Sequence, residues 1–306
     1  MLNPVEQGVL FLLAGGVGFA LSRAAPADRY LNFASLLNVW ISLPGIFLVI
    51  YLARGVLAED AGIVTFSLAI TLVLIGLLLV TTRGLTGEVR GSVVMNGAIV
   101  NAVNLPFPLL QLLIGSYSYA ATFAATVSAV QIVAAKILQG HFGTGSGKGA
   151  TASLTRLVPL ATLGLGIALH YIVWPVSPSG GLVDGVDAVE DILIAFICFH
   201  FGLTLGRSLS SSKTQYQLIS RPFLTIASFR VVLGPLLATL FAIPFGVGSP
   251  TYLQLIFEAA MPPAILNTVI AGIYGFDVDL AAKSTIILTP INAAEAIGLF
   301  YALRGF

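Results

Sequence analysis

The stretch Arg90–Gly115 decides the fold, and it reads RGSVVMNGAIVNAVNLPFPLLQLLIG. It is apolar over the length of a membrane span, yet its middle carries polar and helix-breaking residues, namely Asn96, Asn101, Asn104, Pro106 and Pro108. Because each proline removes a backbone donor and clashes with the preceding turn, we expect the helix to break or unwind around residues 103–108. Non-helical backbone at membrane depth is tolerated only where protein buries it or where it lines a watered cavity. The asparagines favour the watered cavity.

A second stretch, Thr251–Phe276, repeats this pattern with Pro262 and Pro263 in its middle and with Glu258 and Asn267 on either side. Two proline-broken helices in corresponding halves of a chain are typical of the binding site of a secondary transporter. The N-terminal ends of such half-helices attract anions, whereas freed carbonyls and C-terminal ends suit a cation. The two stretches therefore predict one crossing that holds an anionic substrate beside a coupling ion.

The composition predicts a polytopic membrane protein. Of 306 residues, 57% are hydrophobic and 9% are charged, and the mean hydropathy is +0.99. A net charge of +1 gives no indication of a nucleic-acid partner, and the single cysteine, Cys198, excludes an intramolecular disulfide. We find neither a nucleophile with its base nor a nucleotide-binding loop, so we expect neither an enzyme nor an ATP-driven pump.

With about 20 apolar residues per span, the chain divides into ten helices and is expected to be all-α. We place them at residues 5–22, 32–53, 61–82, 91–114, 117–138, 155–175, 188–208, 221–246, 251–274 and 281–303. The polar segment 140–153 is expected to be a cytoplasmic linker between a first five-helix repeat, 1–139, and a second, 154–306.

Five helices per half is an odd number, so the two halves are expected to insert with opposite topology, as an inverted repeat. Short matches support the repeat: Gly16-Val-Gly18 corresponds to Gly164-Leu-Gly166, and Leu52-Ala-Arg54 corresponds to Leu205-Gly-Arg207. Basic residues gather in the loops after the odd-numbered helices, which the positive-inside rule places in the cytoplasm. Both termini of this integral protein of the cell (inner) membrane are then expected outside.

Buried charges are the sharpest candidates for chemistry. Glu258 and Glu295 lie deep in apolar segments, where ionisable side chains mark ion or proton pathways. The alternative for Glu258 is a structural role, as a protonated carboxyl or as a partner of Arg230, and the alternative for Glu295 is structural pairing. Asn101 and Asn104 have an alternative too, because they could bond the carbonyls that the prolines release. His200 is favoured as a core histidine, and the three histidines have no metal-ligand spacing.

The segment Asn101–Leu109 resembles the auxin efflux carrier family, whose fourth helix carries an Asn followed seven residues later by Pro and Leu. Asn101, Pro108 and Leu109 match this pattern, whereas Pro106 stands where the family has Gly. The second half is similar to the family's ninth helix in further positions, namely Ala259-Ala-Met261-Pro262, Ala264, Tyr274-Gly275 and Asp277.

This resemblance implies a scaffold domain of helices 1, 2, 6 and 7, with helices 3–5 and 8–10 as a transport domain that moves organic anions by an elevator-like mechanism. Glu258-Ala-Ala-Met261 is also similar to the Glu-x-x-Met of the bile acid sodium symporters, which share the fold. That similarity implies a sodium site whose ligands are Glu258, Asn101 and Met261, completed by Thr122 or Thr126.

Our leading hypothesis is a secondary active transporter of a small carboxylate-type anion, coupled to Na⁺ or H⁺ and without another cofactor. The expected substrate contacts are Asn101, Asn104, Pro106, Pro108, Pro262, Pro263 and Asn267, and the expected ion-coupling residues are Glu258, Glu295, Thr122 and Thr126. The expected partners are the substrate and the lipid bilayer, with no nucleic acid, and the sequence leaves a homodimer open. The alternative is a passive channel or a membrane sensor that binds the same ligand without coupled transport.

Overall fold

The computed structural model describes residues 3–24, 27–144, 158–173, 180–211 and 220–305, and within these ranges the chain is almost entirely helical. The α-helices are α1 (Pro4–Leu21), α2 (Ala27–Leu37), α3 (Leu43–Arg54), α4 (Asp60–Thr81), α5 (Gly87–Ala98), α6 (Pro106–Ile114), α7 (Ser118–Phe142), α9 (Val158–Val173), α10 (Gly180–Ser211), α11 (Arg221–Ala227), α12 (Gly234–Ala242), α13 (Pro250–Ala259), α14 (Leu266–Tyr274) and α15 (Val278–Leu303). Two π-helical turns, η1 (Asn38–Ser42) and η2 (Ser228–Leu233), and a 3₁₀ turn, η3 (Ile243–Phe245), join some of them. The prediction of an all-helical chain is confirmed for these residues.

In the part of the chain that the structure describes, six helical segments are long and apolar enough to cross a membrane: Arg29–Arg54, Asp60–Thr81, Ser118–Phe142, Gly185–Arg207, Arg221–Phe245 and Val278–Leu303. Two apolar helices, Val5–Leu21 and Val158–Ile172, are shorter. These eight overlap eight of the expected spans, and they indicate an integral membrane protein. The other two expected spans, 91–114 and 251–274, are each divided into two short helices. The complete ten-helix inverted repeat stays a prediction.

The first break lies earlier than the prolines predicted. Helix α5 ends at Ala98 and α6 begins at Pro106, so the non-helical residues are 99–105 rather than 103–108. The reason is that the first turn of a helix has backbone N–H groups without helical acceptors, so Pro106 and Pro108 can begin a helix there instead of interrupting one. Pro262 and Pro263 do lie inside their break, between α13 and α14.

The chain forms two compact units, and each takes segments from both halves of the sequence. Unit 1 contains Met1–Asp60, Phe107–Ala121 and Ala152–Lys213, and unit 2 contains Ala61–Pro106, Thr122–Thr151 and Thr214–Phe306. The expected roles of scaffold and transport domain stay predictions. At the expected linker, α7 continues to Phe142, so its first residues are helical, and residues 145–153 lie outside the described residues.

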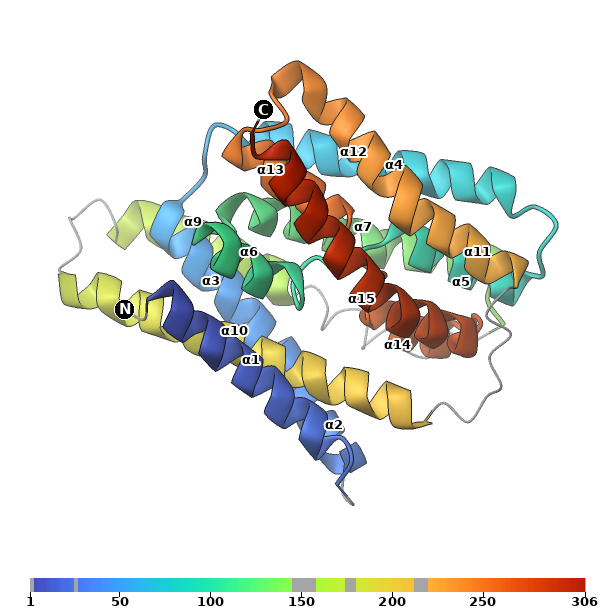
Figure 1. Ribbon diagram of the computed structural model, residues 1–306, viewed down its shortest axis with the longest axis horizontal. Helices are drawn as coiled ribbons and strands as arrows, with labels where there is room; N and C mark the ends of the chain where they lie inside the picture. The colour runs from blue at the N-terminus through green and yellow to red at the C-terminus, as the bar shows by residue number, and fades with distance from the viewer. Residues whose placement is uncertain (1–2, 25–26, 145–157, 174–179, 212–219, 306) are drawn as a thin grey trace. The chain divides into compact units, whose positions relative to one another are not determined.

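Unit 1 is built on close contacts between helix backbones. Helix α1 runs along α10 (Figure 1), and a Cβ atom on Gly18 would overlap the carbonyl oxygen of Phe199. Helix α3 packs against α9 in the same way, since a Cβ on Gly166 would lie 2.7 Å from the Leu48 carbonyl oxygen. Small residues allow membrane helices to approach this closely. Gly18 and Gly166 are corresponding residues of the internal sequence match, so this pair of contacts is consistent with a repeat.

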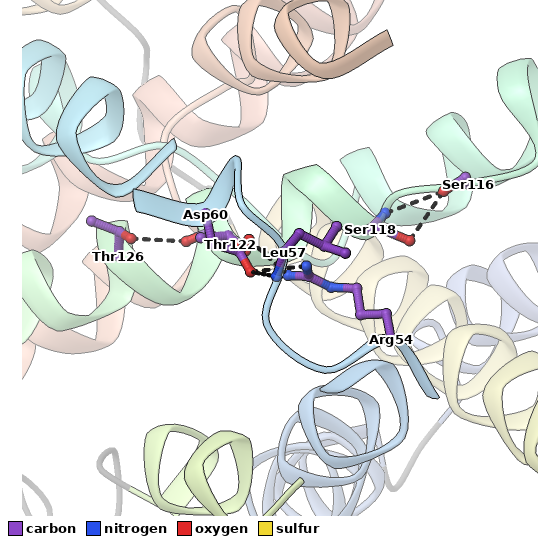
Figure 2. A network of polar contacts seen from close by, with 7 residues as sticks. All are labelled: Arg54, Leu57, Asp60, Ser116, Ser118, Thr122 and Thr126. Atoms are coloured by element: carbon purple, nitrogen blue, oxygen red, sulfur yellow. Dashed lines mark hydrogen bonds and ion pairs between the residues drawn. The ribbon is translucent and has the colours of Figure 1, made fainter. Parts of the chain in front are cut away.

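A largely buried ion pair fixes the corner after α3, still within unit 1 (Figure 2). The guanidinium of Arg54 donates from Nη1 and Nη2 to the Asp60 carboxylate at 3.0 and 3.1 Å, and it lies 4.4 Å from the centre of the Tyr51 ring. The backbone N–H of Leu57 donates to the same carboxylate at 2.8 Å. Asp60 also begins α4, where negative charge complements the helix dipole. Arg54 therefore holds a bend in the chain in place.

Two glycines of α1 provide a test of the backbone contact with α10. Gly18→Ala would place a methyl group on the Phe199 carbonyl, and overpacking of this kind costs about 1–3 kcal/mol. Gly16→Ala is the matched control, because no atom lies within 4 Å of its Cβ position. We expect thermal unfolding in detergent to give a lower melting temperature for G18A only. Equal melting temperatures for the two variants would contradict the packing.

Candidate functional site

The two helix breaks of unit 2 meet backbone to backbone. Val100 and Pro263 form an antiparallel bridge, flanked by a hydrogen bond of 2.8 Å from Asn101 N to Pro262 O and one of 3.1 Å from Ala264 N to Ile99 O. We call residues 99–101 together with 262–264 the crossing. Backbone groups released by one break are thus satisfied by the other, which is what a low-dielectric environment requires.

Prolines suit this crossing because of where their missing donors fall. In an antiparallel pair, the two residues directly opposite each other in a non-hydrogen-bonded position exchange no bonds, and Val100 and Pro263 occupy such a position. Pro262 contributes only its carbonyl, which accepts from Asn101. Neither proline leaves a partner without a donor, so the crossing forms although its second segment has two consecutive prolines.

Asn267 fastens the crossing to its surroundings. Its side chain is 1% exposed, and Nδ2 donates to the carbonyls of Met95 and Ile99 at 3.2 and 3.1 Å. Its Oδ1 accepts from Gln131 Nε2 of α7 at 2.8 Å. The amide of Asn267 is therefore occupied by the protein, in the carbonyl-bonding role that was the alternative for Asn101 and Asn104. Its expected contact with substrate stays a prediction.

Asn101 and Asn104 leave polar atoms free at the first break. Asn101 is buried, and its Oδ1 accepts from the backbone N–H of Asn104 at 3.2 Å. This bond fixes the orientation of the Asn101 amide, whose Nδ2 has no hydrogen-bond partner in the described part of the chain. The Oδ1 of Asn104 is also without a partner there. Buried donors are normally hydrogen-bonded, so a donor without a partner in the protein is a candidate to bind an acceptor atom of a ligand.

Glu258 lies in α13, one turn before the crossing, and its side chain is 0% exposed. Neither carboxyl oxygen has a hydrogen-bond partner among the described residues, so the alternative of direct pairing with Arg230 is not formed. An isolated buried carboxylate is costly, and such a group needs a proton or a cation. Glu258 is thus the acidic group of unit 2 best placed to exchange positive charge.

The residues expected to bind Na⁺ fit that ion only in part. Glu258 offers two free oxygens, but Asn101 presents its free Nδ2, a donor, rather than an oxygen. The Thr126 hydroxyl donates to the backbone oxygen of Thr122 at 2.8 Å (Figure 2). Within the described ranges no cluster of three or more His, Cys, Asp or Glu residues is arranged to hold a metal ion. Hard cations prefer several oxygen ligands, and this arrangement supplies few of them.

Arg230, Asn292 and Glu295 form a second polar group in unit 2. Arg230 Nε donates to the carbonyl of Gly97 at 2.9 Å. Asn292 Nδ2 donates to the Arg230 carbonyl at 3.2 Å and to Glu295 Oε2 at 3.0 Å. The Glu295 carboxyl and the Arg230 guanidinium attract each other. Sequence reasoning singled out both charges but missed Asn292 and Gln131, although an amide inside an apolar helix is itself a signal.

Not every expected residue lies at the crossing. Pro106 belongs to unit 2, whereas Pro108 lies in α6, most of which belongs to unit 1. His200 is a buried residue of α10 in unit 1, with Nε2 at 3.1 Å from Ser35 Oγ. Met261 is fully buried in the second break, and its backbone N–H donates to the Glu258 carbonyl at 3.1 Å.

Comparison with known proteins gives a family match for a segment in the second half of the chain. Residues 160–296 match the model of a family described as membrane transport protein, the family of the auxin efflux carriers. The matched segment extends from α9 into α15 and includes Arg230, Glu258, Asn267 and the second half of the crossing. A search of curated proteins finds no match. The resemblance to the auxin efflux carrier family is thereby confirmed.

Asn267 allows a test of how the crossing is held. Asn267→Leu keeps the size of the side chain but removes the acceptor of the buried Gln131 amide and the second donor to the Met95 and Ile99 carbonyls, and an unsatisfied buried donor costs about 1–3 kcal/mol. Val269→Ala in the same helix is the control, because Val269 is 51% exposed. We expect a lower melting temperature for N267L than for V269A. A melting temperature of N267L equal to that of the wild type would overturn the role given to this amide.

Proposed function

Because residues 160–296 are those of a membrane transport protein of the auxin efflux carrier family, we propose that the chain is a secondary active transporter of a small organic anion of the carboxylate type. The observation that carries this proposal is the crossing in unit 2. It leaves a buried donor, Asn101 Nδ2, and a buried acid, Glu258, without partners in the described part of the chain. One group suits an anion and the other suits a positive charge.

The anion is proposed to bind at the first break. Asn101 Nδ2 can donate to a carboxylate oxygen, and a hydrogen bond to an ionised group is stronger than one between neutral groups. Helix α14 begins beside the crossing without a side-chain cap, so the positive end of its dipole adds to the attraction. Asn104 and the prolines Pro106, Pro262 and Pro263 shape the non-helical backbone around this donor.

The coupling charge is proposed to act at Glu258, with Glu295 as a second acid held by Asn292. A buried carboxyl group is costly when it is charged and unpaired, and less so when it holds a proton or a cation. The free energy of burying the site therefore depends on whether the positive charge is bound. Coupling follows if anion and positive charge enter together, because each lowers the cost of burying the other. No step is assigned to Na⁺, since the expected ligands Asn101, Thr122, Thr126 and Met261 complete its site only in part.

An elevator-like alternating access is proposed for the movement. Its support is the family resemblance together with the division of the chain into two compact units, one of which contains the whole crossing. A passive channel is disfavoured because the unpartnered buried amides and the acid of unit 2 gather near the two breaks instead of lining several helices along their length.

Uptake into proteoliposomes tests the function. The full chain is reconstituted and loaded with unlabelled mono- and dicarboxylates, and counterflow of the labelled compounds is measured. For a transported carboxylate we expect Asn101→Leu to raise KM about tenfold or more, since a bond to a charged group contributes about 1.5–3 kcal/mol. We expect Glu258→Gln to retain exchange but to lose accumulation driven by an ion gradient.

Ser228→Ala is the control variant, because Ser228 is exposed and its hydroxyl donates to the Leu224 carbonyl of the preceding turn at 2.7 Å. It should transport as the wild type does. Unchanged uptake by both N101L and E258Q would contradict the site. Uptake that never exceeds the outside concentration under any imposed ion gradient would favour the passive channel.

A further inference from the structure

Arg230 lies where the first halves of both broken helices end. Its side chain is 0% exposed, and Nε donates at 2.9 Å to the carbonyl of Gly97, in the last turn of α5. A Cβ atom on Gly234 would lie 3.1 Å from Arg230 Nη2 and 3.2 Å from the carbonyl oxygen of Ala259, the last residue of α13. The guanidinium therefore lies close to the carbonyl ends of α5 and α13 together.

The local sequence prepares this position. Gly234 has no side chain, which leaves room for the guanidinium on one side and the Ala259 carbonyl on the other. Pro235 follows and cannot donate to the preceding turn, and the chain there forms the wide π-helical turn η2 that contains Arg230. Asn292 Nδ2 then holds the Arg230 carbonyl at 3.2 Å. The position of the charge is thus fixed by three neighbouring features.

The carbonyl end of a helix carries partial negative charge and favours a cation. In transporters with broken helices, these ends and the freed carbonyls coordinate the coupling cation. Here the ends of α5 and α13 already have a positive charge beside them. Asn101, expected as a sodium ligand, has its oxygen engaged by Asn104 and offers a donor instead.

We propose that Arg230 is a resident cation at the carbonyl ends of α5 and α13, which takes the place that a bound Na⁺ would occupy, so that transport does not require Na⁺. This inference rests on the proposed transport function and narrows its choice of coupling ion. Arg230 Nη1 and Nη2 make no hydrogen bond within the described residues, so no acceptor there engages this end of the guanidinium. Its charge is therefore not cancelled by a contact ion pair.

The test compares Na⁺ with K⁺ and needs no substrate. Melting temperatures of the purified full chain are measured in sodium chloride and in potassium chloride of equal concentration. An ion that binds only the native state raises the melting temperature. A sodium site would therefore give a higher melting temperature in sodium chloride than in potassium chloride. We expect no difference for the wild type. We expect Arg230→Met to melt at a lower temperature and to be stabilised by Na⁺ over K⁺, because the vacated carbonyls become available.

Arg230→Lys and Glu295→Gln are the controls. R230K keeps a positive charge at the carbonyl ends, and E295Q keeps Arg230 itself, so neither should gain a response to Na⁺. A sodium-specific stabilisation of the wild type or of R230K, or none in a folded R230M, would overturn the inference. If R230M does not fold, the melting temperatures of the wild type and of R230K in the two salts still test the inference. A negative result of this salt comparison would overturn the role of Arg230 but not the proposed transport, which carboxylate counterflow tests. Conversely, if counterflow is absent while the melting temperatures are as expected, the transport function is overturned and the position of the Arg230 charge is not.

Discussion

The structure of unit 2 depends on one constraint: a membrane helix that breaks must find partners for its backbone within the protein. The Ile99 carbonyl accepts from Ala264 N–H, and Asn101 N–H donates to the Pro262 carbonyl, so one hydrogen bond lies on each side of a single bridge. Each break would be costly alone, because lipid offers no hydrogen bonds. Together they stabilise each other, and the arrangement explains why prolines are tolerated in the middle of two apolar stretches.

The same constraint separates structural from available polar groups. The Asn267 amide donates to the carbonyls of Met95 and Ile99, and Arg230 Nε donates to the carbonyl of Gly97. Side chains from later in the chain thus add hydrogen bonds to the carbonyls around the end of α5. Asn101 Nδ2 and the carboxyl of Glu258, by contrast, have no hydrogen-bond partner among the described residues. A donor and an acid that the fold does not consume are the groups from which binding and coupling can be built.

Much of this was accessible from the sequence, because proline pairs and intramembrane polar residues have few physical explanations. Helical class, apolar spans and two breaks were predicted in this way, whereas the family was predicted from the resemblance of the two broken segments to known carriers. The position of the first break was wrong, since sequence does not tell whether Pro106 interrupts a helix or begins one. The division of labour between Asn101 and Asn267 was also inaccessible, because both asparagines flank prolines and only their partners distinguish them. Gln131, which donates to Asn267, lies 136 residues before it in the sequence.

The crossing itself can be measured by disulfide formation between Val100→Cys and Pro263→Cys in a Cys198→Ala background. Residues opposite each other in a non-hydrogen-bonded pair have Cα atoms about 4.5 Å apart, which lies within the range of a disulfide. The account predicts rapid intramolecular crosslinking of this pair in membranes under mild oxidation, and little crosslinking between Val100→Cys and Val269→Cys, on the exposed face of α14. Absence of the 100–263 crosslink, or equal crosslinking of both pairs, would contradict it.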